Sequence, residues 1–255
     1  MEQVSQQVKR GQGILIFIYT VAGLLVGWWL LAWGLDSPAV PYPWDAVKSL
    51  GECLKGDLLL HLGVSLYRVL VSLILATILA VPLGLFLGKN QEIDRRVAPL
   101  VYLTYPIPKV VFMPIFLILL GMGDASKIVL ITLITFYQIL VTTRDAAKNL
   151  EKGHISSVRS LGANSFALYR HVYFPACLPA ILTSLRLGLG TALAVLFLAE
   201  TYATQQGIGF FIMDSLSRMN YEEMFAGIIA MGLMGFFLYL LLDQGEKIFC
   251  PWTRL

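Results

Sequence analysis

Residues 156–175 read SSVRSLGANSFALYRHVYFP, a polar and basic stretch that interrupts a largely apolar chain. It belongs to a longer polar segment, 144–176, in which five cations gather: Arg144, Lys148, Lys152, Arg159 and Arg170. We expect Ser156 to cap a short helix that ends near Ala163, with Gly162 at a turn that requires either positive φ or close approach of a partner's backbone. Loops of this length seldom lack a function. The stretch therefore predicts a helical projection at a membrane surface.

Apolar blocks dominate the rest of the chain. Hydrophobic residues make up 57% of the 255 residues and charged residues only 14%, against about 25% charged residues in soluble domains. Blocks of about twenty residues cross a bilayer core of ~30 Å as helices, because lipid satisfies no free backbone group. The sequence predicts an all-α, polytopic membrane protein with about six transmembrane helices, at roughly 14–35, 62–88, 97–121, 126–143, 178–199 and 224–243.

The distribution of Lys and Arg predicts how these spans are oriented. With a cytoplasmic N-terminus, the outside segments hold only four cations: Lys48, Lys55, Lys127 and Arg218. The inside segments then hold the five cations of 144–176 and seven more: Lys9, Arg10, Lys89, Arg95, Arg96, Lys247 and Arg254. Cations concentrate on the cytoplasmic side, so we expect both termini inside. The run 14–35 is too long for the core of a secretory signal, and we expect it to remain as the first span.

The third span is interrupted by Tyr105-Pro106-Ile107-Pro108-Lys109. Proline removes a backbone donor, and irregular backbone at membrane depth is tolerated only where protein or water covers it. This pattern favours a broken helix that lines a path through the protein, with a simple proline kink as the alternative. Elsewhere, two pairs of small residues are typical of close helix contacts: Gly23 with Gly27, and Gly84 with Gly88.

Three cations fall within spans, where an unpaired charge costs at least about 2.5 kcal/mol at the bilayer centre. Arg68 lies near the outer end of its span, and we expect its side chain to reach the surface. Lys109 and Arg186 lie deeper, and together they fit a path for small anions. Alternatively, Arg186 only ties helix termini together. Glu200, at the outer end of the fifth span, either pairs with one of these two cations or faces an external partner.

The chain shows no pattern typical of an enzyme or of a metal or nucleotide site. The cysteines, Cys53, Cys177 and Cys250, are too far apart for a metal motif, and the three histidines are scattered. Residues 84–90, GLFLGKN, lack both the spacing and the Ser or Thr of a phosphate-binding loop. No strong basic patch indicates nucleic acid. We therefore expect no cofactor bound by this chain.

The stretch 156–175 resembles the cytoplasmic signature of binding-protein-dependent ABC importer permeases: Glu-Ala-Ala, three residues, Gly, nine residues, Ile-x-Leu-Pro. The spacing from Gly162 to Val172 and Pro175 matches, while Ser156, Ser157, Val158, Val172 and Phe174 depart from the signature residues. Other segments resemble the sulfonate, nitrate and taurine branch of these permeases: Pro106-x-Pro108, Pro114, Leu120-Gly121-Met122-Gly123, Leu185-Arg186-Leu187-Gly188, Ala199-Glu200 and Gly207-Ile208-Gly209.

The resemblance implies a type I ABC importer permease in the bacterial inner membrane. It implies three regions: residues 1–61 with the first span and an external segment, a permease core at 62–245, and a cytoplasmic tail at 246–255. The coupling loop would dock on a cytoplasmic ATPase subunit, which holds ATP and Mg, through Ser156, Ser157, Val158, Arg159, Gly162, Ala163, Arg170, Val172, Phe174 and Pro175. Arg159 and Arg170 would pair with acidic groups there, or serve only as inside cations.

An extracytoplasmic solute-binding protein and a second copy of the permease would complete the importer. The path would include Pro106, Pro108, Lys109, Arg186 and Glu200. The implied solute is a small anion of the sulfonate, taurine or nitrate class, with a pyrimidine precursor or another small organic nutrient as the alternative. An ion-coupled secondary transporter would require acidic or histidine relays within the spans, and the first four predicted spans contain no Asp or Glu.

Overall fold

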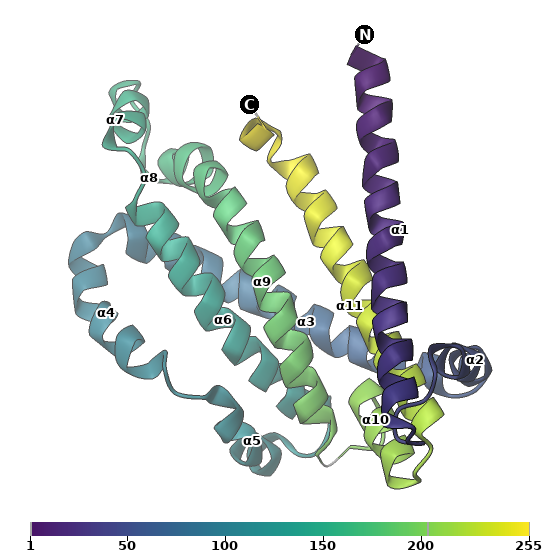
Figure 1. Ribbon diagram of the computed structural model, residues 1–255. Coiled ribbons are helices and arrows are strands. Elements are labelled where there is room, and N and C mark those ends of the chain that lie inside the picture. The colour runs from purple at the N-terminus through teal and green to yellow at the C-terminus, as the bar shows by residue number, and fades with distance from the viewer. Residues whose placement is uncertain (1, 203, 255) are drawn as a thin grey trace. The chain divides into compact units, whose positions relative to one another are not determined.

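The computed structural model describes residues 2–202 and 204–254, and the side chains of 15–16, 18–151, 153, 155–202 and 204–252. Within these ranges every regular element is helical (Figure 1), as predicted. The elements are α1 (Glu2–Leu35), α2 (Pro43–Cys53), α3 (Leu58–Lys89), α4 (Gln91–Thr104), the 3-10 helix η1 (Lys109–Phe112), α5 (Met113–Leu120), α6 (Asp124–Lys148), α7 (Lys152–Ser160), α8 (Ser165–Leu168), the π-helix η2 (Tyr169–Tyr173), α9 (Phe174–Glu200), α10 (Ile208–Ser217), α11 (Tyr221–Phe249) and η3 (Pro251–Arg254).

Five helical segments among the described residues are long and apolar enough to cross a membrane: 18–35, 58–89, 124–148, 165–200 and 221–249. A sixth span is formed if α4 and the η1–α5 segment are taken together, and these two are bent by 78°. The bend lies at residues 105–108, where the two prolines cannot donate helical hydrogen bonds. The prediction of about six spans is therefore confirmed, and the third is broken rather than simply kinked.

The chain divides into two compact units. The first contains residues 1–59 and 211–230, and the second contains residues 60–210 and 231–255. In the first unit, the indole Nε1 of Trp28 donates to the carbonyl oxygen of Pro41 at 3.0 Å, and its ring stacks on Phe225 with centroids 5.4 Å apart. These contacts hold the turn after α1 and the start of α11 together within that unit. Residues 43–53 of this unit form the short helix α2.

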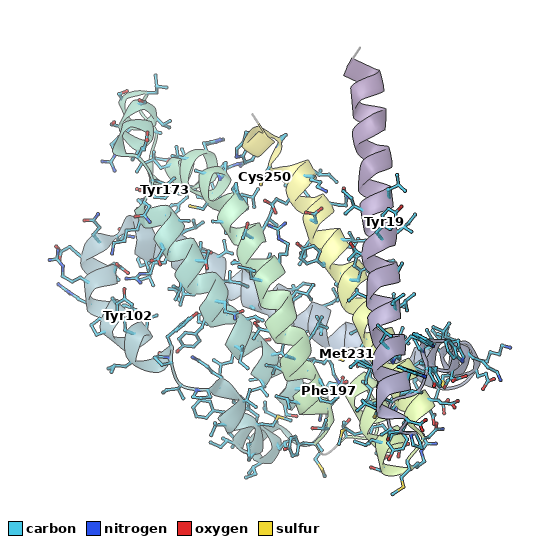
Figure 2. The ribbon with its side chains drawn as sticks, in the orientation of Figure 1. Tyr19, Tyr102, Tyr173, Phe197, Met231 and Cys250 are labelled. Atoms are coloured by element: carbon cyan, nitrogen blue, oxygen red, sulfur yellow. The ribbon has the colours of Figure 1, made fainter. Side chains whose placement is uncertain are left out.

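The core of the second unit is built on α3, α6 and α9 (Figures 1 and 2). A Cβ atom added at Gly84 would lie 2.8 Å from Thr143 Cβ, and one added at Gly88 would lie 2.5 Å from Ala147 Cβ. The small-residue contact predicted for this pair is confirmed, because only glycine lets α3 approach α6 so closely. The contact predicted for Gly23 and Gly27 stays a prediction, because added Cβ atoms would meet nothing within 4 Å in the described chain.

Candidate functional site

The predicted coupling loop forms two short helices separated by a glycine turn. α7 carries Arg159 on its exposed surface, and the chain then turns at Gly162 with φ +85°. This confirms the positive φ expected there, a conformation that costs other residues about 1–2 kcal/mol. α8 begins after Asn164, whose side-chain oxygen accepts a hydrogen bond from the backbone N–H of Ala167 at 2.8 Å. The sequence SSVRSLGAN therefore encodes a helix, a turn and a new helix start.

The helix cap expected at Ser156 is wrong. α7 begins at Lys152, so Ser156 lies inside the helix, and Glu151 is the residue at its N-cap position. The hydroxyl of Ser156 donates to the carbonyl oxygen of Gly153 at 3.1 Å, and that of Ser157 donates to the same oxygen at 2.9 Å. These bonds run along the helix toward its start, as is common for Ser in helix interiors. Ser156 therefore does not begin the projecting helix.

Two large apolar side chains are exposed around the turn. Leu161 is 86% exposed and Phe166 is 71% exposed, and they flank Gly162 and Asn164 in the sequence. Arg170 is also exposed, and Val158 and Ala163 are partly buried against the core cluster. Exposed apolar groups beside cations are suited to a protein partner more than to water. The exposure of this apolar pair was not predicted from the sequence, because Leu and Phe side chains are usually buried in a protein core.

The far side of the loop is anchored in the core of the second unit. Val172 of the π-helix and Leu168 of α8 are buried, and Tyr173 lies beside them at the same end of the core (Figure 2). The ammonium group of Lys89, at the end of α3, lies 4.1 Å from the centroid of the Tyr169 ring. Phe174 and Pro175 begin α9, with proline at the first turn, where its missing N–H is harmless. These buried contacts attach the α7–α8 segment to the start of α9.

At the helix break, the cation Lys109 is directed at backbone carbonyls. Its ammonium group donates to the carbonyl oxygens of Thr104 at 2.9 Å and Tyr105 at 2.5 Å, and it lies 4.3 Å from the centroid of the Tyr137 ring. The last carbonyls of a helix have no partners within the helix, and cations there are favourable. Lys109 thus stabilises the end of α4 that Pro106 and Pro108 create, while it also lines a cavity.

Arg186 lies apart from Lys109, and its partners are acidic. Its guanidinium lies 3.3 Å from a carboxylate oxygen of Asp243 and 3.0 Å from one of Glu246, both near the end of α11. Asp243 in turn lies 2.5 Å from the ammonium group of Lys247. This geometry favours the structural alternative for Arg186, because the cluster joins α9 to α11.

Four of the cations assigned to the inside have side chains outside the described set: Lys9, Arg10, Lys152 and Arg254.

Glu200 pairs with neither of the two deep cations. It is fully buried, and its carboxylate accepts hydrogen bonds from Arg68 Nη1 at 2.7 Å, from the Ser65 hydroxyl at 2.8 Å and from the Gly209 N–H at 2.9 Å. Arg68 is itself only 2% exposed, so the expectation that it reaches the surface is wrong. Each member of this buried network is held by several partners, which is the condition under which a buried ion pair is tolerated.

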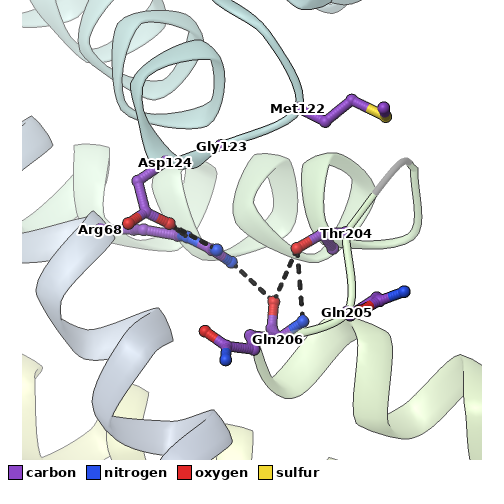
Figure 3. A pocket seen from close by; sticks show the side chains of 7 residues that line it. All are labelled: Arg68, Met122, Gly123, Asp124, Thr204, Gln205 and Gln206. Atoms are coloured by element: carbon purple, nitrogen blue, oxygen red, sulfur yellow. Dashed lines mark hydrogen bonds and ion pairs between the residues drawn. The ribbon is translucent and has the colours of Figure 1, made fainter.

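Asp124 completes this network, and sequence reasoning missed it. Arg68 donates to Asp124 Oδ1 through Nε at 2.8 Å and through Nη2 at 2.6 Å, and it donates to the carbonyl oxygen of Gln206 at 2.9 Å (Figure 3). These residues line a cavity of about 600 Å³ together with Thr204. The network joins the start of α6 to the end of α9 and to the loop that follows it. It lies at the opposite end of the core from the coupling loop.

A second buried ion cluster lies at the coupling-loop end of the core. Asp94, near the start of α4, pairs with Arg144 near the end of α6, and its other oxygen lies 3.0 Å from the ammonium group of Lys148. Asp94 is 3% exposed and Arg144 is 3% exposed. The sequence predicts only inside cations at these two helix ends and does not predict the ion cluster. The described residues contain no cluster of His, Cys, Asp and Glu suited to a metal ion.

A family model described as "Binding-protein-dependent transport system inner membrane component" matches residues 80–255. The chain is 30% identical over 247 residues to the taurine transport system permease protein of Escherichia coli, covering 94% of this chain and 90% of that protein. It is 26% identical over 232 residues to the formylaminopyrimidine transport permease protein of Halalkalibacterium halodurans, covering 91% of this chain and 93% of the relative.

Among solved structures, the fold is similar to a chain of the MetNI methionine ABC transporter in an inward-facing conformation. The TM-score is 0.66 at 19% identity, covering 75% of this chain and 96% of the other.

Proposed function

The chain belongs to the family of binding-protein-dependent transport system inner membrane components, the permease subunits of ABC importers, and we propose that it imports a small sulfonate such as taurine. It is a multi-pass inner-membrane transport subunit of the type I fold rather than an enzyme. The observation that carries the proposed solute is the similarity to the taurine permease, which extends along nearly the whole of both chains.

The proposed ATPase-docking surface consists of the α7–α8 segment, residues 152–168. It presents Leu161, Phe166 and Arg159 around the positive-φ turn at Gly162. An apolar pair that is largely exposed, next to a cation, is suited to a cleft that is apolar inside and acidic at its rim. The opposite side of the segment is anchored through Leu168 and Val172. Force applied by the partner is therefore passed to α9.

The proposed importer has three further components. A separate cytoplasmic ATPase subunit holds ATP and Mg, a second copy of this chain completes the path, and an external binding protein delivers the solute. Both termini lie in the cytoplasm, as the Lys and Arg distribution favours. ATP binding draws the two coupling loops together, and the spans alternate between inward-open and outward-open states. The energy comes from the different affinities of these states for ATP and solute.

A pyrimidine precursor is the second candidate solute. It is favoured by the 26% identity to the formylaminopyrimidine permease over a comparable share of both chains. A neutral or weakly basic ring would make less use of the positive charge of Lys109 than a sulfonate would. We therefore rank the sulfonate first. Competition between taurine and a formylaminopyrimidine for uptake separates the two candidates directly.

The test is reconstitution of the chain in liposomes with its ATPase and binding protein. We expect ATP-dependent uptake of radiolabelled taurine. Gly162→Val is expected to insert normally and to abolish uptake, because a β-branched residue is strained at φ +85° and shifts the apolar pair. Gly245→Val is the matched control, since Gly245 lies in α11 outside the docking surface, has no positive φ and has nothing within 4 Å of an added Cβ.

Copurification of the Gly162→Val protein with the ATPase shows whether uptake is lost because the ATPase no longer binds or because ATP hydrolysis is no longer coupled to transport. Normal ATPase binding and normal uptake by this variant would refute the assignment of the docking surface. Absence of taurine uptake by the wild-type complex, with uptake of a formylaminopyrimidine, would instead replace the proposed solute and leave the coupling loop intact.

A further inference from the structure

The short helix α2 connects two helices that are long and apolar enough to cross a membrane. It is separated from α1 by residues 36–42 and from α3 by residues 54–57. Its 11 residues are about 16 Å long, which is too short to cross a core of ~30 Å. Figure 1 shows α2 nearly end-on beside the lower end of α1, so that it lies crosswise to that helix rather than along it. This placement is suited to a helix that runs along a membrane surface.

The chain that leads into α2 folds back beside α1. The indole Nε1 of Trp28 donates to the carbonyl oxygen of Pro41 at 3.0 Å. Trp28 lies seven residues before Leu35, the last residue of α1, which is about 10 Å along the helix axis. Because helical side chains tilt toward the N-terminus, the indole does not reach outward past the end of α1. α2 therefore begins beside the last two turns of an apolar helix, and not in the water beyond it.

The surface of α2 has three sides with different surroundings. One side is buried within the described chain and consists of Pro43, Ala46 and Ser49. A second side is apolar yet exposed, with Trp44 at 55%, Val47 at 54% and Leu54, the C-cap residue, at 39%. We call this set the apolar side. The third side, which we call the charged side, is exposed and consists of Lys48 and Glu52.

The three sides occupy separate sectors around the helix. Successive residues turn by about 100°. With Trp44 at zero, the apolar side lies at about 280–360°, the charged side at about 40–80° and the buried side at about 140–260°. The apolar side is thus bounded by packed protein on one edge and by charges on the other. A helix surrounded only by protein and water needs no separate apolar sector on its exposed surface.

The composition of the apolar side is typical of a contact with lipid. Tryptophan is enriched where a bilayer meets water, since its ring is apolar and its N–H is polar. The Trp44 ring stacks on that of Tyr42 with centroids 4.7 Å apart, which restricts its orientation. Amphipathic helices in this position bury their apolar face about 5–10 Å deep. The charged side carries one cation and one anion, so burial of apolar surface, and not attraction to anionic lipid, would hold the helix.

The apolar side is also continuous along the chain with other exposed apolar residues. Within the same compact unit, the last turns of α1 expose Leu31, Trp33 and Leu35, each by 60% or more. Leu59, at the start of α3, is 58% exposed. In a multi-pass membrane protein, such residues on the spans are covered by lipid. The elements before and after α2 therefore indicate which partner covers its apolar side.

We propose that α2 lies in the interface between bilayer and water, with its apolar side in the lipid and its charged side in the water. The partner of this surface is the bilayer itself, and no particular headgroup is required. The proposal goes beyond the proposed import function. It depends neither on the solute nor on which face of the membrane is cytoplasmic, because it uses only the surroundings of α2.

The test measures the surroundings of single residues in the full-length chain. A nitroxide spin label is attached to one cysteine in a cysteine-free background, and the protein is reconstituted in phosphatidylcholine vesicles. Molecular oxygen, which concentrates in lipid, and a neutral nickel chelate, which stays in water, are compared as relaxation agents. The chelate is present on both sides of the vesicle membrane, so that the result does not depend on orientation.

Val47→Cys and Lys48→Cys are the matched pair, because the two positions are adjacent and both are exposed. We expect oxygen to relax the label at position 47 more strongly than the chelate does, and the chelate to be the stronger agent at position 48. Leu54→Cys and Glu52→Cys repeat the comparison further along the helix. If Val47→Cys does not yield folded protein, this second pair decides the question.

Two results would overturn the proposal. Equal and strong relaxation by the chelate at positions 47 and 48 would show that the apolar side faces water. Protection of position 47 from both agents, with position 48 open to the chelate, would show that protein covers the apolar side, as in contact with a second copy of the chain. Neither result bears on uptake, so the import assignment stands or falls by its own experiment.

Discussion

The guanidinium Nη1 of Arg68 lies 2.7 Å from Oε1 of Glu200, which is 132 residues away in the chain. Arg68 comes from α3 and Glu200 is the last residue of α9, and both side chains are buried. Since Arg68 also holds Asp124 at the start of α6, one guanidinium ties three helices together at the end of the core opposite to the coupling loop. In the proposed orientation this is the external end, where the path must open to receive solute.

Removal of one partner from this pair is expected to be costly. Arg68→Met leaves the buried carboxylate of Glu200 without its cation, and such losses cost about 3–5 kcal/mol. We expect a clear fall in the apparent melting temperature of the purified protein. Arg68→Met combined with Glu200→Gln is expected to recover part of this loss, because no buried charge then lacks a partner.

The control for this prediction is Arg218→Met. Arg218 pairs with Asp214 and Glu223, but its side chain is 51% exposed. Exposed pairs contribute about 0–1 kcal/mol, so this variant is expected to melt close to wild type. Equal melting temperatures for Arg68→Met and Arg218→Met would show that the buried network does not stabilise the fold.

Gly207 is expected to tolerate no side chain. Its φ is +118°, and an added Cβ would lie 2.5 Å from each carboxylate oxygen of Glu200. Gly207→Ala must therefore displace the carboxylate from Arg68 and Ser65, and we expect a loss of stability comparable to that of Arg68→Met. Gly190→Ala, inside α9 with nothing within 4 Å of an added Cβ, is the matched control and is expected to gain up to about 1 kcal/mol. The melting temperatures of the wild type, Gly207→Ala and Gly190→Ala measure both effects.

Features encoded by short stretches were predictable from the sequence. The spans follow from apolar blocks, the break follows from Pro106 and Pro108, and the turn follows from Gly162. The predicted N-cap of α7 lies five residues after the observed one, because a polar helix such as Lys152–Ser160 carries no apolar period that marks its beginning. The sequence therefore predicts the cap at Ser156, which lies inside the helix.

The ion clusters were not predictable, because their members are distant in sequence. Nothing near Arg68 indicates that Glu200 and Asp124 lie beside it, and nothing near Asp94 indicates Arg144. A charge inside an apolar block signals only that some partner is required. The buried side-chain oxygen Oε1 of Gln138, which has no hydrogen-bond partner among the described residues, was not predictable for the same reason. Its burial and the bond from Nε2 to Thr191 depend on how α6 packs on α9.

Asn164, rather than Ser156, is expected to control the order of the coupling loop. Asn164→Ala removes the bond to the N–H of Ala167 and costs about 1 kcal/mol of helix stability. Ser156→Ala removes a bond from its hydroxyl to Gly153 within α7 and improves helix propensity, so a smaller effect is expected. Hydrogen exchange of peptides that cover 160–172 measures both. Faster exchange in Ser156→Ala than in Asn164→Ala would contradict the placement of the helix start.

The proposed orientation predicts which sites an impermeant thiol reagent reaches in intact cells. The native cysteines are poor reporters: Cys250 is 0% exposed, and burial raises the pKa of the Cys53 thiol, so that less of it is the reactive thiolate at neutral pH. Labelling of Cys53 is accordingly expected to quicken as the pH rises from 7 toward 9. Exposed positions in a cysteine-free background, Lys55→Cys and Trp252→Cys, avoid this difficulty.

Lys55 follows α2 in the segment assigned to the outside, and Trp252 follows α11 in the tail assigned to the cytoplasm. We expect the Lys55→Cys protein to be labelled in intact cells and the Trp252→Cys protein to be labelled only after the membrane is permeabilised. Because both positions are exposed, a difference between them reports the side of the membrane rather than burial. Labelling of Trp252→Cys in intact cells would reverse the orientation. The docking surface at Gly162 would then lie outside, away from any cytoplasmic ATPase, and the proposed coupling mechanism would fail.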